Sequence, residues 1–299
     1  MRINGLEVED TYAEAFDGLF CRLIVTAADR KRLEKAVTSV TALPSTVFGE
    51  AEGGVEAWLS EKDTPDGRAG AVIQLWVNYT KDGPAVLERE LGKRVRQGVL
   101  VVPTTRVFNA LDSEKKIDSM ERIGHCGDGY EFVESRFGRE VINVPIMMGE
   151  FLIERLLGFS KGVMGGNVWI YCDSEETALR AGGKAVEAVS SVPYAITPFD
   201  ICSAGSKVES NFPDIGPTTN HPYCPSLRSR IKDSKVPPGV RSIPEIVING
   251  KSLEIVKYAM KRAIYALKGE KGVLFISAGN FGGKLGKNKI FLKELIFEG

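Results

Sequence analysis

One order of elements occurs twice along the chain: an apolar strand, a capped amphipathic helix, further strands, a second helix and a closing strand. In the first half, Phe20–Ala28 is apolar and rich in β-branched residues, which predicts a buried strand. Asp29 is a favourable N-cap for the helix predicted over Arg30–Val40, where apolar residues recur at helical spacing. A second helix is predicted over Pro84–Gln97. The remaining strands predicted in this half are Thr46–Gly49, Val55–Leu59, Ala71–Val77 and Val99–Val102.

The second half repeats this order. Asn167–Cys172 predicts a strand, and Asp173 or Ser174 can cap the long helix predicted over Glu175–Ser190. Lys251–Leu267 predicts another helix, because its apolar residues fall on one side. The strands predicted here are Tyr194–Cys202, Glu245–Ile248, Val273–Ala278 and Ile290–Leu292, with a turn at Asn249-Gly250 and a long surface loop over Pro213–Pro238.

This repeated order predicts an α+β fold of two ferredoxin-like lobes, each a split β-α-β unit. A parallel α/β sheet is the competing interpretation, but several connections are too short to hold crossover helices. We place the boundary near Pro145, after a glycine-bearing hairpin around Gly138. The predicted domains are therefore an N-terminal lobe over residues 1–145 and a C-terminal lobe over residues 146–299.

The charge balance excludes several classes of partner. Lys and Arg together number 39, as do Asp and Glu, so the formal net charge is zero and there is no basic excess for nucleic acid. The N-terminus carries charge where a signal peptide would have its apolar run, and no stretch approaches about 18 apolar residues in a row. We expect a cytoplasmic protein that binds neither nucleic acid nor membrane.

Cysteine and histidine offer little for metal or covalent chemistry. The five cysteines include no CxxC pair, which argues against a disulfide framework and a zinc site and favours small buried thiols. Neither His125 nor His221 singles out a Ser or Cys nucleophile, and the chain has no GxSxG sequence. We expect no metal site, and acid–base chemistry falls to carboxylates, Lys or Tyr.

Two glycine-rich stretches fail as nucleotide motifs. Gly162–Asn167 comes before a predicted strand, whereas a dinucleotide fingerprint follows a strand and opens a helix. Phe281–Gly286 follows a strand, but no helical pattern comes after it. Both are predicted to be tight turns or places where the backbone approaches a ligand closely.

Among the carboxylates beside glycine turns, Glu245 is the candidate general acid or base. It opens the apolar strand Glu245–Ile248, so the fold can hold it at the edge of a core, where partial desolvation would raise its pKa toward neutrality. An ordinary strand-end charge is the alternative, and the physics of the residues alone favours that alternative. The other carboxylates considered are Glu50, Glu52, Asp128 and Glu150.

Several sequence blocks, in colinear order from residue 4 to about residue 286, favour a functional role for Glu245 over an ordinary surface charge. They are Asn4–Phe16, Thr64–Gly70, Pro103–Leu111, Gly127–Glu131, Val144–Phe151, Gly162–Asn167, Glu245–Gly250 (EIVING) and Ile276–Gly286 (ISAGNFGGKLG). Through them the chain resembles, over its full length, the archaeal formyltransferase family that moves a formyl group from formylmethanofuran to tetrahydromethanopterin.

The resemblance implies two ferredoxin-like lobes and direct formyl transfer to N5 of the pterin through a tetrahedral intermediate, in archaeal one-carbon metabolism and methanogenesis. It implies no tightly bound cofactor, with methanofuran and tetrahydromethanopterin acting as carrier substrates, and a homodimer or homotetramer. Glu245 matches the family's proposed proton-handling glutamate. Backbone amides near Ser203–Lys207 and Asn280–Gly283 are candidate donors to the developing oxyanion. The substrate-binding residues implied are Glu52, Ser203, Ser206, Lys207, Asn280, Phe281, Gly282 and Gly283.

One segment departs from the family pattern. Pro198–Lys207 (PFDICSAGSK) is two residues shorter than the family's corresponding segment and lacks its glycine pair. This departure favours an altered binding role, so a non-catalytic or subunit-type paralogue that binds the carriers or scaffolds a one-carbon enzyme complex is the alternative. A third interpretation keeps an enzyme that passes formyl groups on for hydrolysis in a formyltransferase/hydrolase assembly.

Overall fold

The computed structural model describes residues 1–3, 5–43, 50–205, 207, 210–216 and 218–297. The chain forms two compact units, one made of Met1–Asp17 with Gly162–Gly299 and the other of Gly18–Lys161. These units are defined by which residues pack together, so one of them combines two separate stretches of the chain. The predicted boundary instead divides the sequence at one point, between residues 145 and 146, and it stays a prediction. The strand predicted over Thr46–Gly49 lies outside the described residues.

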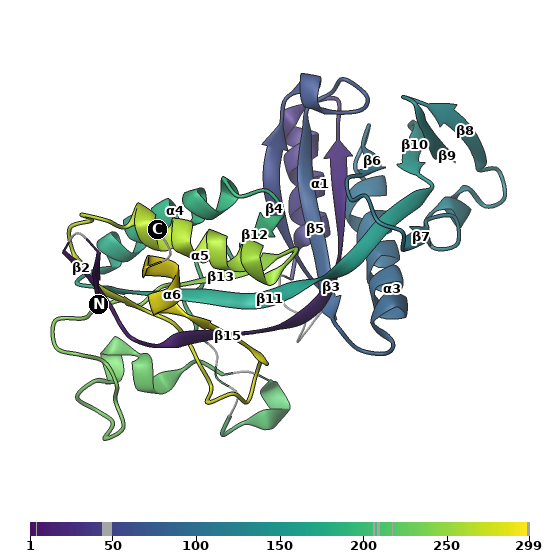
Figure 1. Cartoon of the computed structure of the whole chain (residues 1–299). Helices are drawn as coiled ribbons and strands as arrows, with labels where there is room; N and C mark the ends of the chain where they lie inside the picture. The colour runs from purple at the N-terminus through teal and green to yellow at the C-terminus, as the bar shows by residue number, and fades with distance from the viewer. Residues whose placement is uncertain (4, 44–49, 206, 208–209, 217, 298–299) are drawn as a thin grey trace. The chain divides into compact units, whose positions relative to one another are not determined.

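The Gly18–Lys161 unit is built on a β-α-β-β-α-β order. Its elements are β3 (Tyr12–Thr26, which begins in the other unit), α1 (Arg30–Thr41), β4 (Glu52–Leu59), β5 (Gly70–Asn78), α3 (Gly83–Val95) and β6 (Arg106–Asn109). The strands lie side by side in the order β6-β3-β5-β4, and each neighbouring pair is antiparallel. This order is the ferredoxin-like arrangement. One core joins the apolar faces of α1 and α3 to the sheet (Figure 1).

Local signals fix helix α1 as predicted. The Asp29 side chain accepts a hydrogen bond from the Arg32 backbone N–H at 3.0 Å, which satisfies one of the free amides of the first turn. Leu33, Ala36 and Val37 recur on one side and are buried in the core, because that spacing places them on one helix face.

The strand predicted over Val99–Val102 is wrong. After α3 the chain continues as a π-helical turn over Arg96–Leu100, and the strand that follows is β6. A Cβ on Gly98 would lie 2.8 Å from the backbone nitrogen of Val40, so glycine lets this turn pack directly against the end of α1. A short apolar run has no periodicity with which to separate a strand from a helical turn.

A hairpin arm extends the same unit. It holds β7 (Lys116–Asp118), β8 (Phe132–Arg136), β9 (Arg139–Ile146) and β10 (Gly149–Glu154). The β8–β9 hairpin turns at Gly138, whose φ of +69° suits glycine, so the predicted hairpin is confirmed. β10 pairs with β9 antiparallel and with β6 parallel, which joins the arm to the sheet.

The other unit repeats the ferredoxin-like order. It contains β11 (Leu156–Cys172, which begins in the first unit), α4 (Glu175–Ser190), β12 (Ala195–Ile196), β13 (Glu245–Gly250), α5 (Leu253–Ala266) and β14 (Val273–Ser277), together with β1 (Arg2–Ile3), β2 (Leu6–Val8), β15 (Asn288–Phe291) and α6 (Leu292–Phe297). The central strands lie in the order β14-β11-β13-β12, all antiparallel. The predicted α+β class with two ferredoxin-like lobes is confirmed. None of the helices within the described ranges is long and apolar enough to cross a membrane.

Three details of this half differ from the predictions. The strand expected over Tyr194–Cys202 is confined to β12, and Asn249 and Gly250 end β13 instead of forming a turn. Gly162–Asn167 lies inside β11, not before it, where the register with β13 shifts between Val163 and Gly166. Such a bulge explains why a glycine-rich stretch can belong to a long strand.

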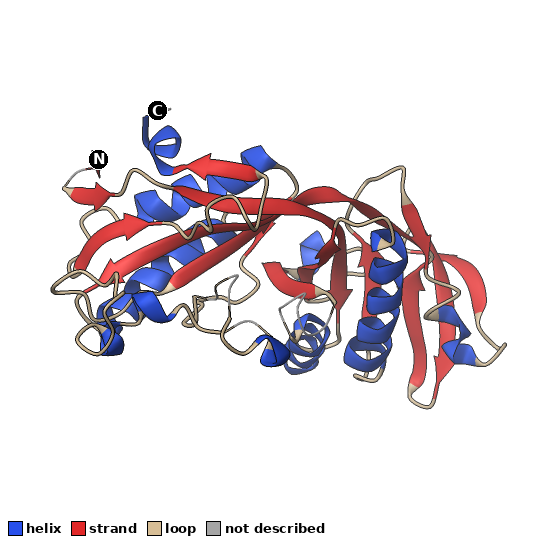
Figure 2. Cartoon of the chain, turned by 90° about the horizontal axis from the view of Figure 1, so that it is seen from below, coloured by secondary structure: helices blue, strands red, loops and turns tan. Residues whose placement is uncertain are grey.

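The two faces of this second sheet have different covers. Helices α4 and α5 lie on one face (Figure 2) and share its apolar core with β11 and β13. On the opposite face, Tyr223, Val236 and Val240 from the long loop pack against Trp169 and Tyr171 of β11. Figure 1 draws this loop in green on the side away from α4 and α5. The loop predicted over Pro213–Pro238 is therefore partly a covering layer, with short 3₁₀ turns.

The N-terminal strand is joined to the C-terminal turn by one buried carboxylate. Glu14 on β3 is fully buried and accepts hydrogen bonds from the backbone amides of Phe281, Gly283, Leu285 and Gly286. Burial alone would raise the pKa of Glu14, but these amides outweigh it and hold the pKa below its usual value.

Glu14→Gln is expected to lower the free energy of unfolding by about 1–3 kcal/mol, because a neutral amide is a weaker acceptor and brings a donor toward other donors. The stability that Glu14 contributes is complete above the ordinary glutamate pKa of about 4.3 and is lost as the pH falls through the lowered one. The variant should therefore lose less stability in acid than the wild type. Urea unfolding at pH 7 and pH 3 measures both effects. Glu7→Gln, at an exposed position on β2, is the matched control, and an equal effect of the two variants would contradict the role of Glu14.

Candidate active site

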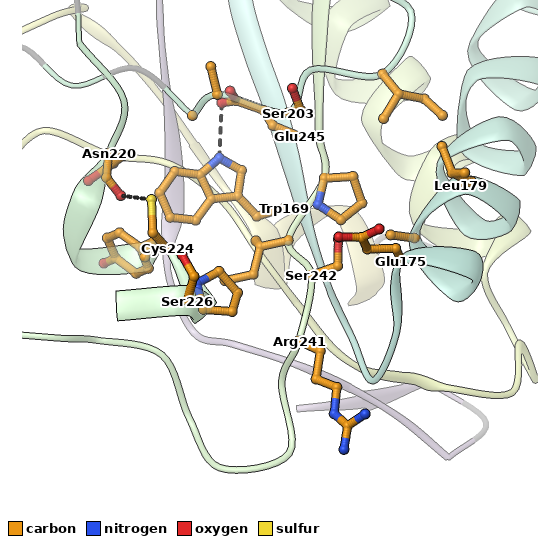
Figure 3. A pocket seen from close by; sticks show the side chains of 18 residues that line it. Trp169, Glu175, Leu179, Ser203, Asn220, Cys224, Ser226, Arg241, Ser242 and Glu245 are labelled. Atoms are coloured by element: carbon orange, nitrogen blue, oxygen red, sulfur yellow. Dashed lines mark hydrogen bonds between the residues drawn. The ribbon is translucent and has the colours of Figure 1, made fainter. Parts of the chain in front are cut away.

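A pocket of about 450 Å³ lies in the unit made of Met1–Asp17 and Gly162–Gly299, between the start of α4 and the long loop (Figure 3). Its walls belong to that unit: Trp169 near the end of β11, the start of α4, and residues from the segments 201–205, 220–226 and 241–245. A volume of this order can enclose a substantial part of a small-molecule ligand.

Glu245 lies in this pocket at the first position of β13. The register places it opposite Trp169 of β11, whose Nε1–H donates a hydrogen bond to the Glu245 Oε1 at 2.9 Å (Figure 3). On its other side Glu245 forms an isolated antiparallel bridge with Cys202. Burial raises the pKa of the Glu245 carboxyl, and hydrogen bonds from the Trp169 indole and the Cys202 thiol oppose part of that rise. Such a carboxyl can give and take a proton near neutral pH.

The Trp169 indole is itself tightly held. Tyr223 packs edge-on against it, with ring centroids 4.7 Å apart. A Cβ on Gly279 would lie 2.8 Å from the indole ring, so only glycine fits there. The Asn167 side chain fixes that glycine by accepting from the Gly279 N–H at 2.6 Å and donating to the Gly279 carbonyl at 3.2 Å. The turn after β14 thus positions the indole that positions Glu245.

The rest of the pocket is of mixed polarity. Its polar lining residues include Glu175, Ser203, Ser226 and Ser242. Arg241 also lines it, and its side chain extends away from Glu245 in Figure 3. The pocket therefore offers hydroxyl groups and both signs of charge around one perturbed carboxyl.

Two of the predicted site residues, Glu245 and Ser203, line this pocket together. Ser206 lies outside the described residues. Lys207 is not among the lining residues, and its Nζ lies 3.0 Å from the Nδ1 of His221. Glu52 is buried at the start of β4 in the other unit.

The predicted Asn280–Gly283 donors have partners within the protein. The Asn280 side chain donates to the Thr11 hydroxyl, and the amides of Phe281 and Gly283 donate to Glu14. Both amides therefore already have an acceptor in this structure, and Gly279 just before them lies against the Trp169 indole. Gly282, between them, is exposed.

Sequence reasoning missed Trp169 and Cys202 as neighbours of Glu245. Trp169 looked like one residue of a buried strand, and Cys202 like a small buried thiol. Only the pairing of β11 with β13, and of residue 202 with residue 245, brings the three together. Within the described part of the chain, no three His, Cys, Asp or Glu side chains gather into a group that could hold a metal ion.

Two family models match the chain. The model described as formylmethanofuran-tetrahydromethanopterin formyltransferase matches residues 1–146, and the model described as FTR, proximal lobe, matches residues 149–295. The chain belongs to this family. The match confirms the resemblance drawn from the colinear blocks and the enzyme class that it implied.

Individual relatives agree with this assignment. A formyltransferase-like protein of Methanopyrus kandleri is 60% identical over 299 residues, which cover 100% of both chains. The solved formyltransferase of Methanosarcina barkeri is 41% identical with a TM-score of 0.90, covering 99% of this chain and 100% of that one. A chain of the formyltransferase/hydrolase complex from Methylorubrum extorquens, solved with methylofuran, is 35% identical with a TM-score of 0.90, covering 99% and 98%.

Trp169→Phe is expected to raise the pKa of Glu245 further, because the ring remains but the charged carboxylate loses a donor. The titration can be followed by NMR of glutamate labelled with ¹³C at Cδ, with Glu245→Gln assigning the signal. Trp58→Phe changes an exposed tryptophan of the other unit and is the control. If Trp169→Phe left the Glu245 titration where it is in the wild type, the indole would have no part in setting it.

Proposed function

We propose that this protein transfers a formyl group from formylmethanofuran to N5 of tetrahydromethanopterin in archaeal one-carbon metabolism. Glu245 carries the proposal, since it combines membership of the family's EIVING block with a place in a pocket and a raised pKa. The named activity of the Methanosarcina barkeri relative supports it.

The chemistry is a direct transfer between two amine nitrogens. N5 of the pterin attacks the formamide carbon, a tetrahedral intermediate forms, and its C–N bond to methanofuran breaks as the leaving amine takes up a proton. Glu245 as the protonated acid supplies that proton and, as the carboxylate, accepts the one released from N5. General acid–base help of this kind contributes about 10²–10⁴-fold in rate. Holding two substrates in register contributes further, since it removes translational and rotational freedom before the reaction.

Ser203 lines the same pocket and is the proposed substrate contact beside Glu245. Glu52, Ser206, Lys207, Asn280, Phe281, Gly282 and Gly283 stay proposed as binding residues from the family resemblance. The groups left for binding are the ring or carbonyl of Phe281 and the carbonyl of Gly283, because the amides of both residues already donate to Glu14. Methanofuran and tetrahydromethanopterin act as carriers that bind and leave. The relative solved with methylofuran supports a furan-type carrier.

The wild type, mixed with formylmethanofuran and tetrahydromethanopterin, is expected to form the N5-formyl product, followed by its absorbance. Glu245→Gln keeps the shape of the side chain but cannot exchange the proton, so kcat should fall about 100-fold or more. Glu187→Gln, an exposed carboxylate on α4 of the same unit, is the matched control and should keep wild-type rates.

A folded wild type without turnover would reject the transferase. It would leave the second candidate, a paralogue that binds carriers or serves as a subunit of a one-carbon complex. The formyltransferase/hydrolase complex of Methylorubrum extorquens favours that candidate, because a chain of the same fold works there within an assembly. Carrier binding by isothermal titration without turnover would support it.

We propose further that the chain forms a homodimer or homotetramer and works in the cytoplasm. Exposed apolar side chains on the hairpin arm support the oligomer: Tyr130 is 79% exposed, Met147 fully exposed and Met148 71% exposed. Isolated surface apolar residues are common, but a group on one arm is typical of a protein contact.

Met147→Glu is expected to shift the oligomer toward monomer, because it places a charge in the apolar contact. Light scattering after size exclusion measures the mass. Val101→Glu introduces the same charge at another exposed apolar position of this unit and should leave the mass unchanged. Equal masses for all three proteins would exclude the arm as the contact.

A further inference from the structure

We propose that Cys202 is a positioning residue for Glu245: its thiol donates to the carboxylate and, together with the Trp169 indole, holds it in the orientation that the reaction needs. The proposal rests on the function proposed above, because it assigns a helper to the group that moves the proton. It adds a residue that acts through Glu245 and does not itself touch the reacting atoms.

The backbone forces the two side chains together. The Cys202 N–H donates to the Glu245 carbonyl at 2.8 Å, and the Glu245 N–H donates to the Cys202 carbonyl at 2.9 Å. Two residues that exchange both hydrogen bonds are directly opposite in an antiparallel pair, so their side chains leave the same face. The thiol therefore lies beside the carboxylate, in a position from which it can donate to it.

Neighbouring contacts fix the thiol in place. Ile201 packs against helix α4 so closely that a Cβ on Gly182 would lie 2.8 Å from the Ile201 side chain. On the other side, the Ala204 carbonyl accepts hydrogen bonds from the Asn220 N–H at 3.3 Å and from the Thr219 hydroxyl at 2.8 Å. The backbone that carries the thiol is thus held by α4 on one side and by residues 219 and 220 on the other, as the support of a positioning group requires.

The thiol is a donor at neutral pH. Burial and the charge of Glu245 raise the pKa of Cys202, which keeps the proton on sulfur. The donors that reach Glu245 from the described residues are the Trp169 indole and this thiol, both neutral. The other titratable or charged groups in the pocket are Glu175 from α4, Tyr223 and Cys224 from the long loop, and Arg241, which points away from Glu245 in Figure 3.

These contacts give Glu245 a donor on each side, one rigid and one chemically changeable. The indole is locked between Tyr223 and Gly279. The thiol can be removed by substitution with alanine, replaced by a hydroxyl with serine, or alkylated, and none of these changes alters the indole. Cys202 is therefore the residue through which the orientation of Glu245 can be tested.

The first measurement is the pH profile of formyl transfer by the full chain. In Cys202→Ala, kcat is expected to fall about 10-fold with KM unchanged, since a hydrogen bond to a charged group is lost. The limb of the profile that reports Glu245 should move to higher pH, because the carboxylate loses a donor. Cys202→Ser keeps a donor and should recover most of both changes. Cys126→Ala, at an exposed cysteine of the other unit, is the control.

The second measurement needs no turnover. Iodoacetamide labelling of each cysteine is followed against pH by peptide-resolved mass spectrometry, in the wild type and in Glu245→Gln. Loss of the neighbouring negative charge should lower the pKa of the thiol, so Cys202 is expected to be labelled several-fold faster in Glu245→Gln, with Cys126 unchanged.

The two measurements separate the possible failures. If the wild type shows no turnover but Cys202 labelling responds to Glu245→Gln, the pairing stands and only the proposed reaction fails. If Cys202→Ala keeps the wild-type pH profile, or if labelling of Cys202 ignores Glu245→Gln, the positioning role is overturned.

Discussion

The hydrogen bond from the Trp169 indole to Glu245 is the interaction on which the pocket depends. Its donor belongs to the central strand β11 and its acceptor opens β13, so sheet pairing alone brings the two opposite each other. The indole in turn needs Gly279, whose missing side chain leaves room for the ring. Two blocks that are about 30 residues apart along the chain, EIVING and ISAGNFGGKLG, therefore act on one carboxyl.

The two lobes share an order of elements but hold a carboxylate of the sheet in different ways. In the Gly18–Lys161 unit, Glu56 meets the Arg22 guanidinium through two hydrogen bonds of 2.7 and 2.8 Å and also accepts from Gln74. A bidentate pairing of this kind fixes the position and the plane of the carboxylate. Glu245 is held by neutral donors, which orient it while leaving its proton exchangeable. The same fold can thus carry a structural carboxylate in one lobe and a chemically useful one in the other.

Local signals predicted the elements, and long-range pairing decided the site. The helix Glu175–Ser190 was predicted to the residue, because Ser174 caps it and its apolar residues keep one period. The strand predicted over Val99–Val102 was wrong, because the conformation of this segment depends on the close approach of Gly98 to α1. Glu245 could be found from its place at the start of an apolar strand and from the family block. Cys202 could not, since nothing near it in the sequence shows that residue 245 will be its partner.

The burial of Glu14 under residues 281–286 has a consequence for how the chain is made. Residues 18–161 form a complete unit that has left the ribosome before the second half of the other unit exists. The carboxylate of Glu14 must then wait until a further 267 to 272 residues have been synthesised before it meets its amides. At about 5–20 residues per second, that delay is on the order of tens of seconds. The N-terminal segment is thus synthesised before the Gly18–Lys161 unit, yet it can reach its final place only after that unit is complete.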